Sequence, residues 1–222
     1  MDTAALLTQI ESRTSRDDKN AEAVLGFNLA LAWFQNHGLN ILRSVQTIPL
    51  VSGTYIYDLA SDFAQVTVSS DGVLQQPSIS RGGSLSRLTH VASELAFTNA
   101  DIMSMGGDPS GYKVFGFNST TGRKTIYIGI PTPAAALNVY VPYVQAATKY
   151  VAATTAYESI VSKAYGAFAD EAILKMGESM VWDSLEVYDK AELARKKSVY
   201  YGNKVVGLDD NSPEEIQSNL IM

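Results

Sequence analysis

The stretch that decides the fold is residues 111–143, GYKVFGFNSTTGRKTIYIGIPTPAAALNVYVPY. Apolar side chains alternate with polar or small ones along it, which predicts three successive strands over 112–117, 124–130 and 137–143. Successive side chains of a strand point to opposite faces, so each strand offers one apolar face to a core. Pro142 has no amide hydrogen to donate, which predicts that the third strand lies at a sheet edge or ends at this residue.

Helix-like patterns lie on both sides of this β-rich stretch. Apolar side chains recur there at spacings of three and four residues, which is typical of one face of a helix. The predicted helices start near Thr3, cover about 20–38, cover 157–176 and cover about 179–200. Gly177 is expected to end the third helix, because glycine is common at the left-handed cap position. The sequence therefore predicts an α+β protein, an antiparallel helical bundle with a small antiparallel β domain inserted between its N-terminal and C-terminal helices.

This interpretation divides the chain into four segments. The N-terminal helices occupy 1–43, the inserted β domain with its loops 44–150, the C-terminal helices 151–202 and an extended tail 203–222. Within the β domain, Asp71-Gly72 between two β-prone runs predicts a hairpin. The Ser- and Gly-rich run over 77–86 predicts a loop, and the pattern over 89–97 predicts a short helix.

The composition excludes several classes of protein. Of the 222 residues 46% are hydrophobic, which supplies enough apolar material for a core. The net charge of −6 argues against sequence-independent nucleic-acid binding, because such binding needs a basic surface to displace counterions. The chain has no cysteine, which excludes disulfides, thiolate catalysis and cysteine-ligated zinc. No apolar run approaches the length of about 18 residues that a membrane span needs, and no signal peptide is visible.

Few residues offer catalytic, metal-binding or nucleotide-binding chemistry. His37 and His90 have no strong metal ligand at helical spacing, so we interpret them as loop or helix-end residues. The stretch 116–125 is superficially similar to a phosphate-binding loop. Its glycine spacing is wrong and it leads into a strand, so we interpret it as a hairpin turn. We interpret four acidic residues as a solvated cluster on the tail: Asp209, Asp210, Glu214 and Glu215. We therefore expect neither an enzyme nor a bound metal or cofactor.

The 12 tyrosines have two interpretations. They pack in the core and against the sheets, or they form a subunit interface, because tyrosine combines a large contact area with a polar tip. The sequence leaves both interpretations open.

Five stretches of the chain, taken in order, are similar to a known family. They are the aromatic pair Trp33-Phe34 at a helix end, GTYIYDLASDF at 53–63, the Asp71-Gly72 hairpin, the Pro-x-Pro turn with its flanking strands at 126–140, and the two C-terminal helices. Ala60 replaces a proline that is usual in the second stretch. In this order they resemble the phage head-to-tail connector adaptor proteins, which join the portal ring to the tail.

The resemblance implies a virion structural protein without enzyme activity. Such a protein forms a ring, of twelve copies, beneath the portal protein, and tail or neck proteins bind on the opposite side. The C-terminal segment is expected to contact the portal protein. The resemblance further implies assembly in the host cytoplasm, a final position at the head–tail neck of the virion, and no contact with a membrane.

Two groups of residues are candidates for these contacts. Apolar residues on a polar tail lack a nearby core of their own chain, which independently favours a partner. The candidates for portal binding are Leu208, Ile216, Leu220, Ile221 and Met222. The candidates for contact with proteins of the phage tail lie in the loop 99–110: Ile102, Met103 and Met105. The alternative for this loop is that it folds back on its own domain.

The acidic charge also bears on the DNA that passes through such a ring. A net charge of −6 predicts an acidic channel that repels phosphates, so that DNA passes without sequence-specific binding. Two alternative functions stay open, another multimeric tail structural or tail completion protein and a small soluble enzyme. A cleft with convergent polar groups would favour the enzyme.

Overall fold

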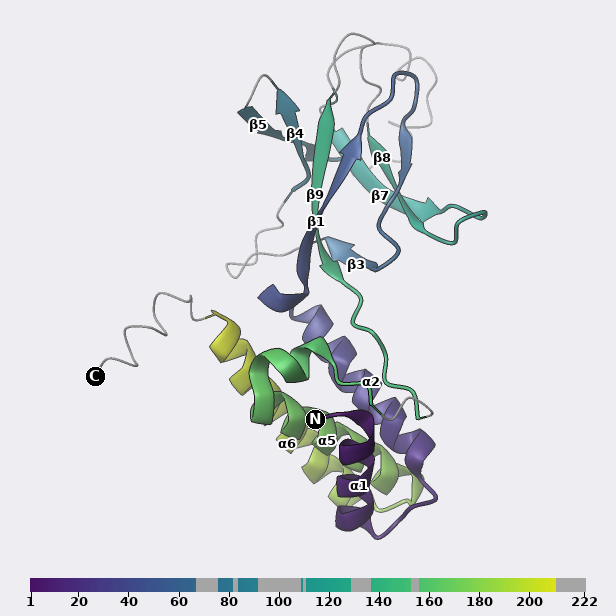
Figure 1. Cartoon of the computed structure of the whole chain (residues 1–222), viewed down its shortest axis with the longest axis vertical. Helices are drawn as coiled ribbons and strands as arrows, with labels where there is room; N and C mark the ends of the chain where they lie inside the picture. The colour runs from purple at the N-terminus through teal and green to yellow at the C-terminus, as the bar shows by residue number, and fades with distance from the viewer. Residues whose placement is uncertain are drawn as a thin grey trace, which may run out of the picture. The chain divides into compact units, whose positions relative to one another are not determined.

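The computed structural model divides into two compact units (Figure 1). The helical unit contains both ends of the chain, Met1–Leu42 and Ala146–Met222, and the β unit consists of Arg43–Gln145. The order of helices, strands and helices confirms the expected α+β class. The structure describes residues 1–66, 76–81, 84–91, 109, 111–128, 137–152 and 156–210.

The helical unit is organised around one long helix. Its elements are α1 (Thr3–Thr14), α2 (Asn20–Asn36), the short 3₁₀ helix η1 (Asn40–Leu42), α5 (Ile160–Ser184) and α6 (Tyr188–Asp210). α5 packs against α2 and α6 and, less extensively, against α1 (Figure 1). The short link between α5 and α6 makes these two helices antiparallel neighbours. Polar caps start two of the helices, because Asp2 Oδ1 accepts a hydrogen bond from Ala5 N at 2.9 Å and Ser159 Oγ accepts one from Ser162 N at 3.0 Å.

The predicted helix end at Gly177 is wrong. α5 continues through this glycine to Ser184, and a Cβ added at Gly177 would lie 2.8 Å from Cδ1 of Phe27. The glycine is thus there because two helices approach closely, and not because a helix ends. The one non-helical residue inside α5 is Gly166, with φ 55° and ψ −131°.

The predicted boundaries of the tail and of the β domain are also wrong. α6 extends to Asp210, so residues 203–210 are helical rather than extended. Residues 146–150 belong to the helical unit, because side chains of α2 form hydrogen bonds with backbone groups of this segment. Asn28 Oδ1 accepts from Tyr150 N at 2.7 Å, and Asn28 Nδ2 donates to Tyr150 O at 3.0 Å.

The β unit contains two sheets. Its strands are β1 (Arg43–Pro49), β2 (Ile56–Asp58), β3 (Phe63–Val66), β4 (Ser78–Arg81), β5 (Ser84–Arg87), β6 (Thr89–His90), β7 (Gly111–Phe117), β8 (Lys124–Ile128) and β9 (Asn138–Gln145). One sheet has the order β1-β9-β4-β5, with β3 also paired to β9, and the other has the order β2-β8-β7-β6. The predicted β7–β8 hairpin is confirmed. The predicted meander is wrong, because β9 joins the other sheet, and β6 pairs with β7 in parallel, so the β unit is not wholly antiparallel.

Both sheets contribute to one core. The predicted alternation is confirmed at Ile126 and Ile128 of β8 and at Val139 and Val141 of β9, all of which are fully buried. They belong to a single cluster that also contains Tyr112 of β7. The aliphatic faces that the sequence indicates therefore meet each other, although they lie on different sheets.

Pro142 lies inside a sheet rather than at its edge. β9 pairs with β1 on one side and with β3 and β4 on the other, and Pro142 stands opposite Val45. Leu50 N donates to Leu137 O at 2.8 Å, and hydrogen-bonded pairs alternate along an antiparallel ladder. The Pro142–Val45 pair is therefore a non-hydrogen-bonded one. Along the other side of β9, Pro142 falls between the residues that pair with β4 and those that pair with β3, so its missing amide hydrogen costs no ladder bond.

Two predictions on the middle of the β unit are corrected. The predicted loop over 77–86 contains the hairpin of β4 and β5, where Ile79 is fully buried and pairs with Ser86. The serines of this segment make a strand look like a loop in the sequence. They are tolerated because, of the β4 side chains that the structure describes, only Ile79 is fully buried in the core. The predicted helix over 89–97 begins with strand β6 instead, because Thr89 and His90 pair with β7. The rest of that helix and the Asp71-Gly72 hairpin lie outside the described residues.

Candidate functional site

Two rows of exposed apolar side chains lie on the outward sides of α2 and α6. Leu25 and Leu29 of α2 are 50% and 44% exposed, and Leu193 and Tyr200 of α6 are 55% and 57% exposed. Each row lies on the side of its helix opposite the buried residues. We define the α2 outer face as Leu25, Leu29 and Ala32, and the α6 outer face as Leu193, Lys197, Tyr200, Lys204 and Leu208.

Small residues on the inner side of α6 explain why its larger apolar residues face outward. The buried positions of this helix include Ala191, Ala194, Ser198 and Gly202. Trp33 of α2 lies so close to Gly202 that an added Cβ would be 2.7 Å from Cζ3 of the indole. Close packing by small side chains leaves no room for Leu or Tyr on that side. The sequence signal for this arrangement is the row of small residues at spacings of three and four along the inner side of α6.

The α6 outer face is positively charged within an acidic chain. Lys204 Nζ lies 5.4 Å from the centroid of the Tyr200 ring, a cation–π contact. The neighbouring Lys196, by contrast, forms an ion pair within α6: its Nζ lies 2.6 Å from Glu192 Oε1. Neither Lys197 nor Lys204 forms an ion pair with any residue that the structure describes. This face therefore offers apolar area together with positive charge that no described residue compensates.

A polar clamp holds the last turn of α6 against η1. Asn40 N donates to both carboxylate oxygens of Asp209, at 3.0 Å to Oδ1 and 2.8 Å to Oδ2. Asn40 Nδ2 donates to Asp209 O at 2.9 Å, and the hydroxyl of Tyr165 donates to Asp209 Oδ1. Asp209, which we interpreted as part of a solvated cluster, instead fixes the end of the helix. The clamp joins the last turn of α6, which contains Leu208, to η1.

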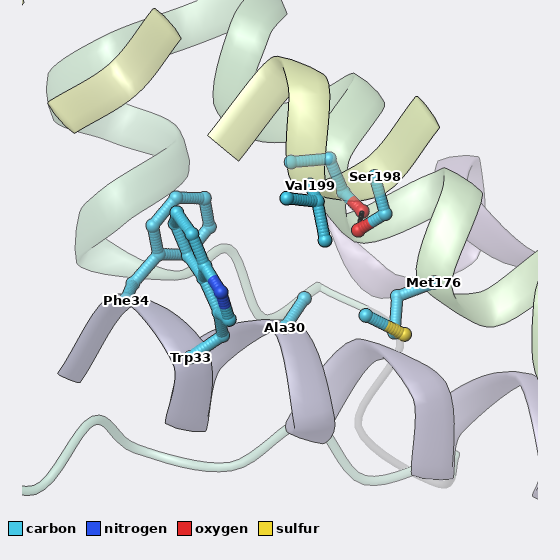
Figure 2. Close-up of a pocket in the computed structure, with 7 residues that line it drawn as sticks. Ala30, Trp33, Phe34, Met176, Ser198 and Val199 are labelled. Carbon is cyan, nitrogen blue, oxygen red and sulfur yellow. Dashed lines mark hydrogen bonds between the residues drawn. The ribbon is translucent and has the colours of Figure 1, made fainter. Parts of the chain in front are cut away.

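A small hollow lies where α2, α5 and α6 meet (Figure 2). It is lined by Ala30, Trp33, Phe34, Ala172, Met176, Ser198 and Val199. Ser198 Oγ already donates to Ala172 O at 2.7 Å, and the remaining lining is mostly apolar. The hollow has room for about one water molecule and has no convergent charged groups, so it is a packing gap and offers no catalytic arrangement.

The tyrosines divide between the core and the surface. Tyr112 and Tyr150 are each 1% exposed, and burial raises the pKa of the Tyr112 hydroxyl. Tyr188 and Tyr200 of α6 are mostly exposed. Core packing thus accounts for the first pair, and the second pair lies where a partner can reach it.

Only one of the predicted contact residues lies within the described part of the chain. Leu208 belongs to α6, not to an extended tail, and is 39% exposed on the outer face of that helix. The other predicted residues lie outside the described residues: Ile102, Met103, Met105, Ile216, Leu220, Ile221 and Met222.

The two histidines have structural partners. His37 follows α2, as a helix-end residue should; its Nδ1 lies 2.8 Å from Trp33 O and its ring lies tilted against the indole. His90 lies in strand β6 with its ring against Tyr112, so its interpretation as a loop or helix-end residue is wrong. Within the described ranges, no group of three or more His, Asp or Glu residues is arranged to hold a metal ion.

The turn between β7 and β8 is built by side chains rather than around an anion. Asn118 Oδ1 accepts hydrogen bonds from Thr120 N at 3.0 Å and from Thr121 N at 3.3 Å. Asp58 accepts from Asn118 Nδ2 and from Thr121 Oγ1, each at 2.9 Å. The amides that would meet a phosphate are already used, and a carboxylate lies beside them. The interpretation of this segment as a hairpin turn is confirmed.

No family model matches the chain, and no curated protein matches it. Among the described helices, none combines the length and the apolar character that crossing a membrane requires.

Proposed function

We propose that this protein is a non-enzymatic virion structural protein, a head-to-tail connector adaptor that forms a ring beneath the portal protein. The observation that carries the proposal is the order of the two units along the chain. Both ends of the chain build one helical unit, and the β unit is inserted between them at Arg43 and Gln145. This is the arrangement that the resemblance implies. The exposed rows on α2 and α6 add support, because apolar side chains gathered on one face of a helix often mark a contact with a partner.

Each proposed partner is assigned to a part of the chain. Other copies of the chain contact the helical unit through its outer faces. The portal protein takes the C-terminal residues Ile216, Leu220, Ile221 and Met222, whereas Leu208 is reassigned to the α6 outer face. Tail or neck proteins of the phage bind on the side of the ring opposite the portal protein, through the loop that contains Ile102, Met103 and Met105. DNA passes through an acidic channel without sequence-specific contacts, and the protein resides at the head–tail neck after assembly in the host cytoplasm.

The experiment that tests this function is binding to the portal protein encoded with this chain. Deletion of residues 211–222 removes the proposed portal contact and leaves α6 with its Asp209 clamp intact. We expect the full chain to bind the portal ring in co-sedimentation and the truncated chain not to bind. A matched control replaces Glu214 and Glu215 by Gln, which keeps the length and the apolar residues of the segment. A full chain that binds isolated tails but not the portal would contradict the proposal and favour a tail completion protein.

A further inference from the structure

From the two outer faces, we infer that neighbouring copies of the chain join back to front, with the α2 outer face of one copy against the α6 outer face of the next. This inference rests on the proposed ring and names the surfaces that build it. The faces are both uncovered within the described residues, and they lie on different helices of one unit. A contact between unlike faces leaves a free face at each end, so it repeats until a ring closes or a filament grows.

The spacing of both rows suits helix-to-helix packing. Leu25, Leu29 and Ala32 follow the pattern i, i+4, i+7, and Leu193, Lys197 and Tyr200 follow the same pattern. Residues so spaced lie along one side of a helix and form the seam of paired helices. Two faces with one period can therefore interdigitate over several turns.

The chemistry of the two faces disfavours contacts between like faces. Residues 23–36 of α2 contain no charged side chain, whereas the α6 outer face carries Lys197 and Lys204. Two α6 faces placed together would bring these lysines against the lysines of the partner, which is repulsive. A contact between two α2 faces would leave Leu193 and Tyr200 uncovered. Only the contact between unlike faces covers both apolar rows without opposing like charges.

The positions of the two outer faces along the axes of α2 and α6 also match. The height of a residue here means its position along these axes. Within one unit Trp33 lies against Gly202 and Asn40 against Asp209, so α2 and α6 run in the same direction. A neighbour related by rotation about an axis along these helices keeps the same heights. The two faces then meet at nearly the same level: Leu193 near Leu25, Lys197 near Leu29, Tyr200 near Ala32 and Lys204 near Asn36.

Two of these meetings are complementary in size and charge. The large Tyr200 ring meets the small Ala32 side chain, as a protruding residue meets a gap. The last turn of α2 contains no basic residue, and the C-terminal end of a helix carries partial negative charge. Lys204 of the neighbour supplies the missing cation at that end.

The test uses two variants of the full chain, each with one altered face. Leu29→Glu places a charge on the α2 outer face, and Leu193→Glu places one on the α6 outer face. The matched control is Leu85→Glu, because Leu85 is 67% exposed and belongs to the β unit. Light scattering after size exclusion measures the mass, and circular dichroism checks the fold. Should Leu29→Glu disturb folding, Ala32→Lys is the second variant of the α2 face.

We expect the wild type and Leu85→Glu to form large assemblies and each face variant alone to remain monomeric. An equimolar mixture of the two face variants retains one good face from each, so it forms a dimer of twice the 24.0 kDa chain mass. Three results would overturn the inference: a monomeric wild type, assembly by a folded face variant, or a mixture that stays monomeric. Portal binding by rings that use other faces would overturn this inference alone. Assembly through these faces without portal binding would instead contradict the adaptor function.

Discussion

Gly26 of α2 and Gly177 of α5 pack backbone against backbone. A Cβ added to Gly26 would lie 2.6 Å from Cα of Gly177 and 2.5 Å from the carbonyl oxygen of Met176. No real Cβ tolerates such distances from a backbone that other helices hold in place. This crossing sets how closely α2 approaches α5, and it therefore determines where the α2 outer face lies.

Gly26→Ala should destabilise the helical unit. The methyl group must push α2 and α5 apart, and overpacking of this kind costs about 1–3 kcal/mol. The better helix propensity of alanine returns about 1 kcal/mol, so we expect a net loss of up to about 2 kcal/mol in the free energy of unfolding. Urea denaturation followed by circular dichroism measures it.

The control for this prediction is Gly207→Ala in α6. An added Cβ at Gly207 meets no atom within 4 Å, so the substitution gains helix propensity at no steric cost. We expect it to stabilise the chain by about 0.5–1 kcal/mol. Equal effects of the two substitutions would show that the α2–α5 crossing is not tightly packed.

Gly166→Ala should destabilise α5 for a conformational reason. Gly166 has φ 55° and ψ −131°, a region that residues with a side chain rarely adopt, yet an added Cβ meets nothing within 4 Å. The penalty therefore comes from the backbone, and we expect a loss of about 1–3 kcal/mol in unfolding free energy. D-alanine at this position, introduced by peptide ligation, accepts positive φ and should restore the stability. A loss with D-alanine as large as with L-alanine would point to a steric cause instead.

Sequence reasoning succeeds where one physical signal dominates. The alternation at Ile126 and Ile128 indicates a strand with one buried face, because period two has no competing explanation there. The helical periodicity that predicts helices before and after the β unit in the sequence is equally direct. These signals are local, and the structure confirms them.

The same reasoning fails where a residue has several possible uses. Gly177 fits a helix end as well as a close helix crossing, and only the position of Phe27 decides between them. Pro142 fits a sheet edge as well as the gap between two partner strands of β9. The candidate site has the same difficulty, since Leu193 and Tyr200 look like core residues until the small residues opposite them are seen to fill the interior.

The ion pair between Arg13 of α1 and Glu171 of α5 should make stability depend on pH. Arg13 Nη2 lies 2.8 Å from Glu171 Oε1, and the hydrogen bond from Arg13 lowers the pKa of Glu171 from its usual 4.5. Because the pKa is lower in the folded state, the stabilisation is complete above about pH 4.5 and is lost as the pH falls through the folded-state value. The pair is partly exposed, so we expect it to contribute about 0.5–1 kcal/mol.

Glu171→Gln should remove this part of the pH dependence. Thermal unfolding between neutral and acidic pH compares the variant with the wild type, and the difference between them should shrink as the pH falls below 4.5. The control is Glu11→Gln, which removes the same charge from α1 at a side chain without a hydrogen bond or ion pair to the described residues. A constant difference between Glu171→Gln and the wild type at every pH would contradict the assignment.

Asp209→Ala should release the last turn of α6 from η1. The substitution removes the acceptors for Asn40 N and for the Tyr165 hydroxyl, and so leaves two donors to find water. We expect faster amide exchange over 203–210 and little change in α5, because the clamp lies at the end of the unit. Asp209→Asn keeps one acceptor oxygen and should show an intermediate effect. If Asp209→Ala exchanges as slowly as the wild type, packing alone orders the end of α6, and the clamp does not set the position of Leu208.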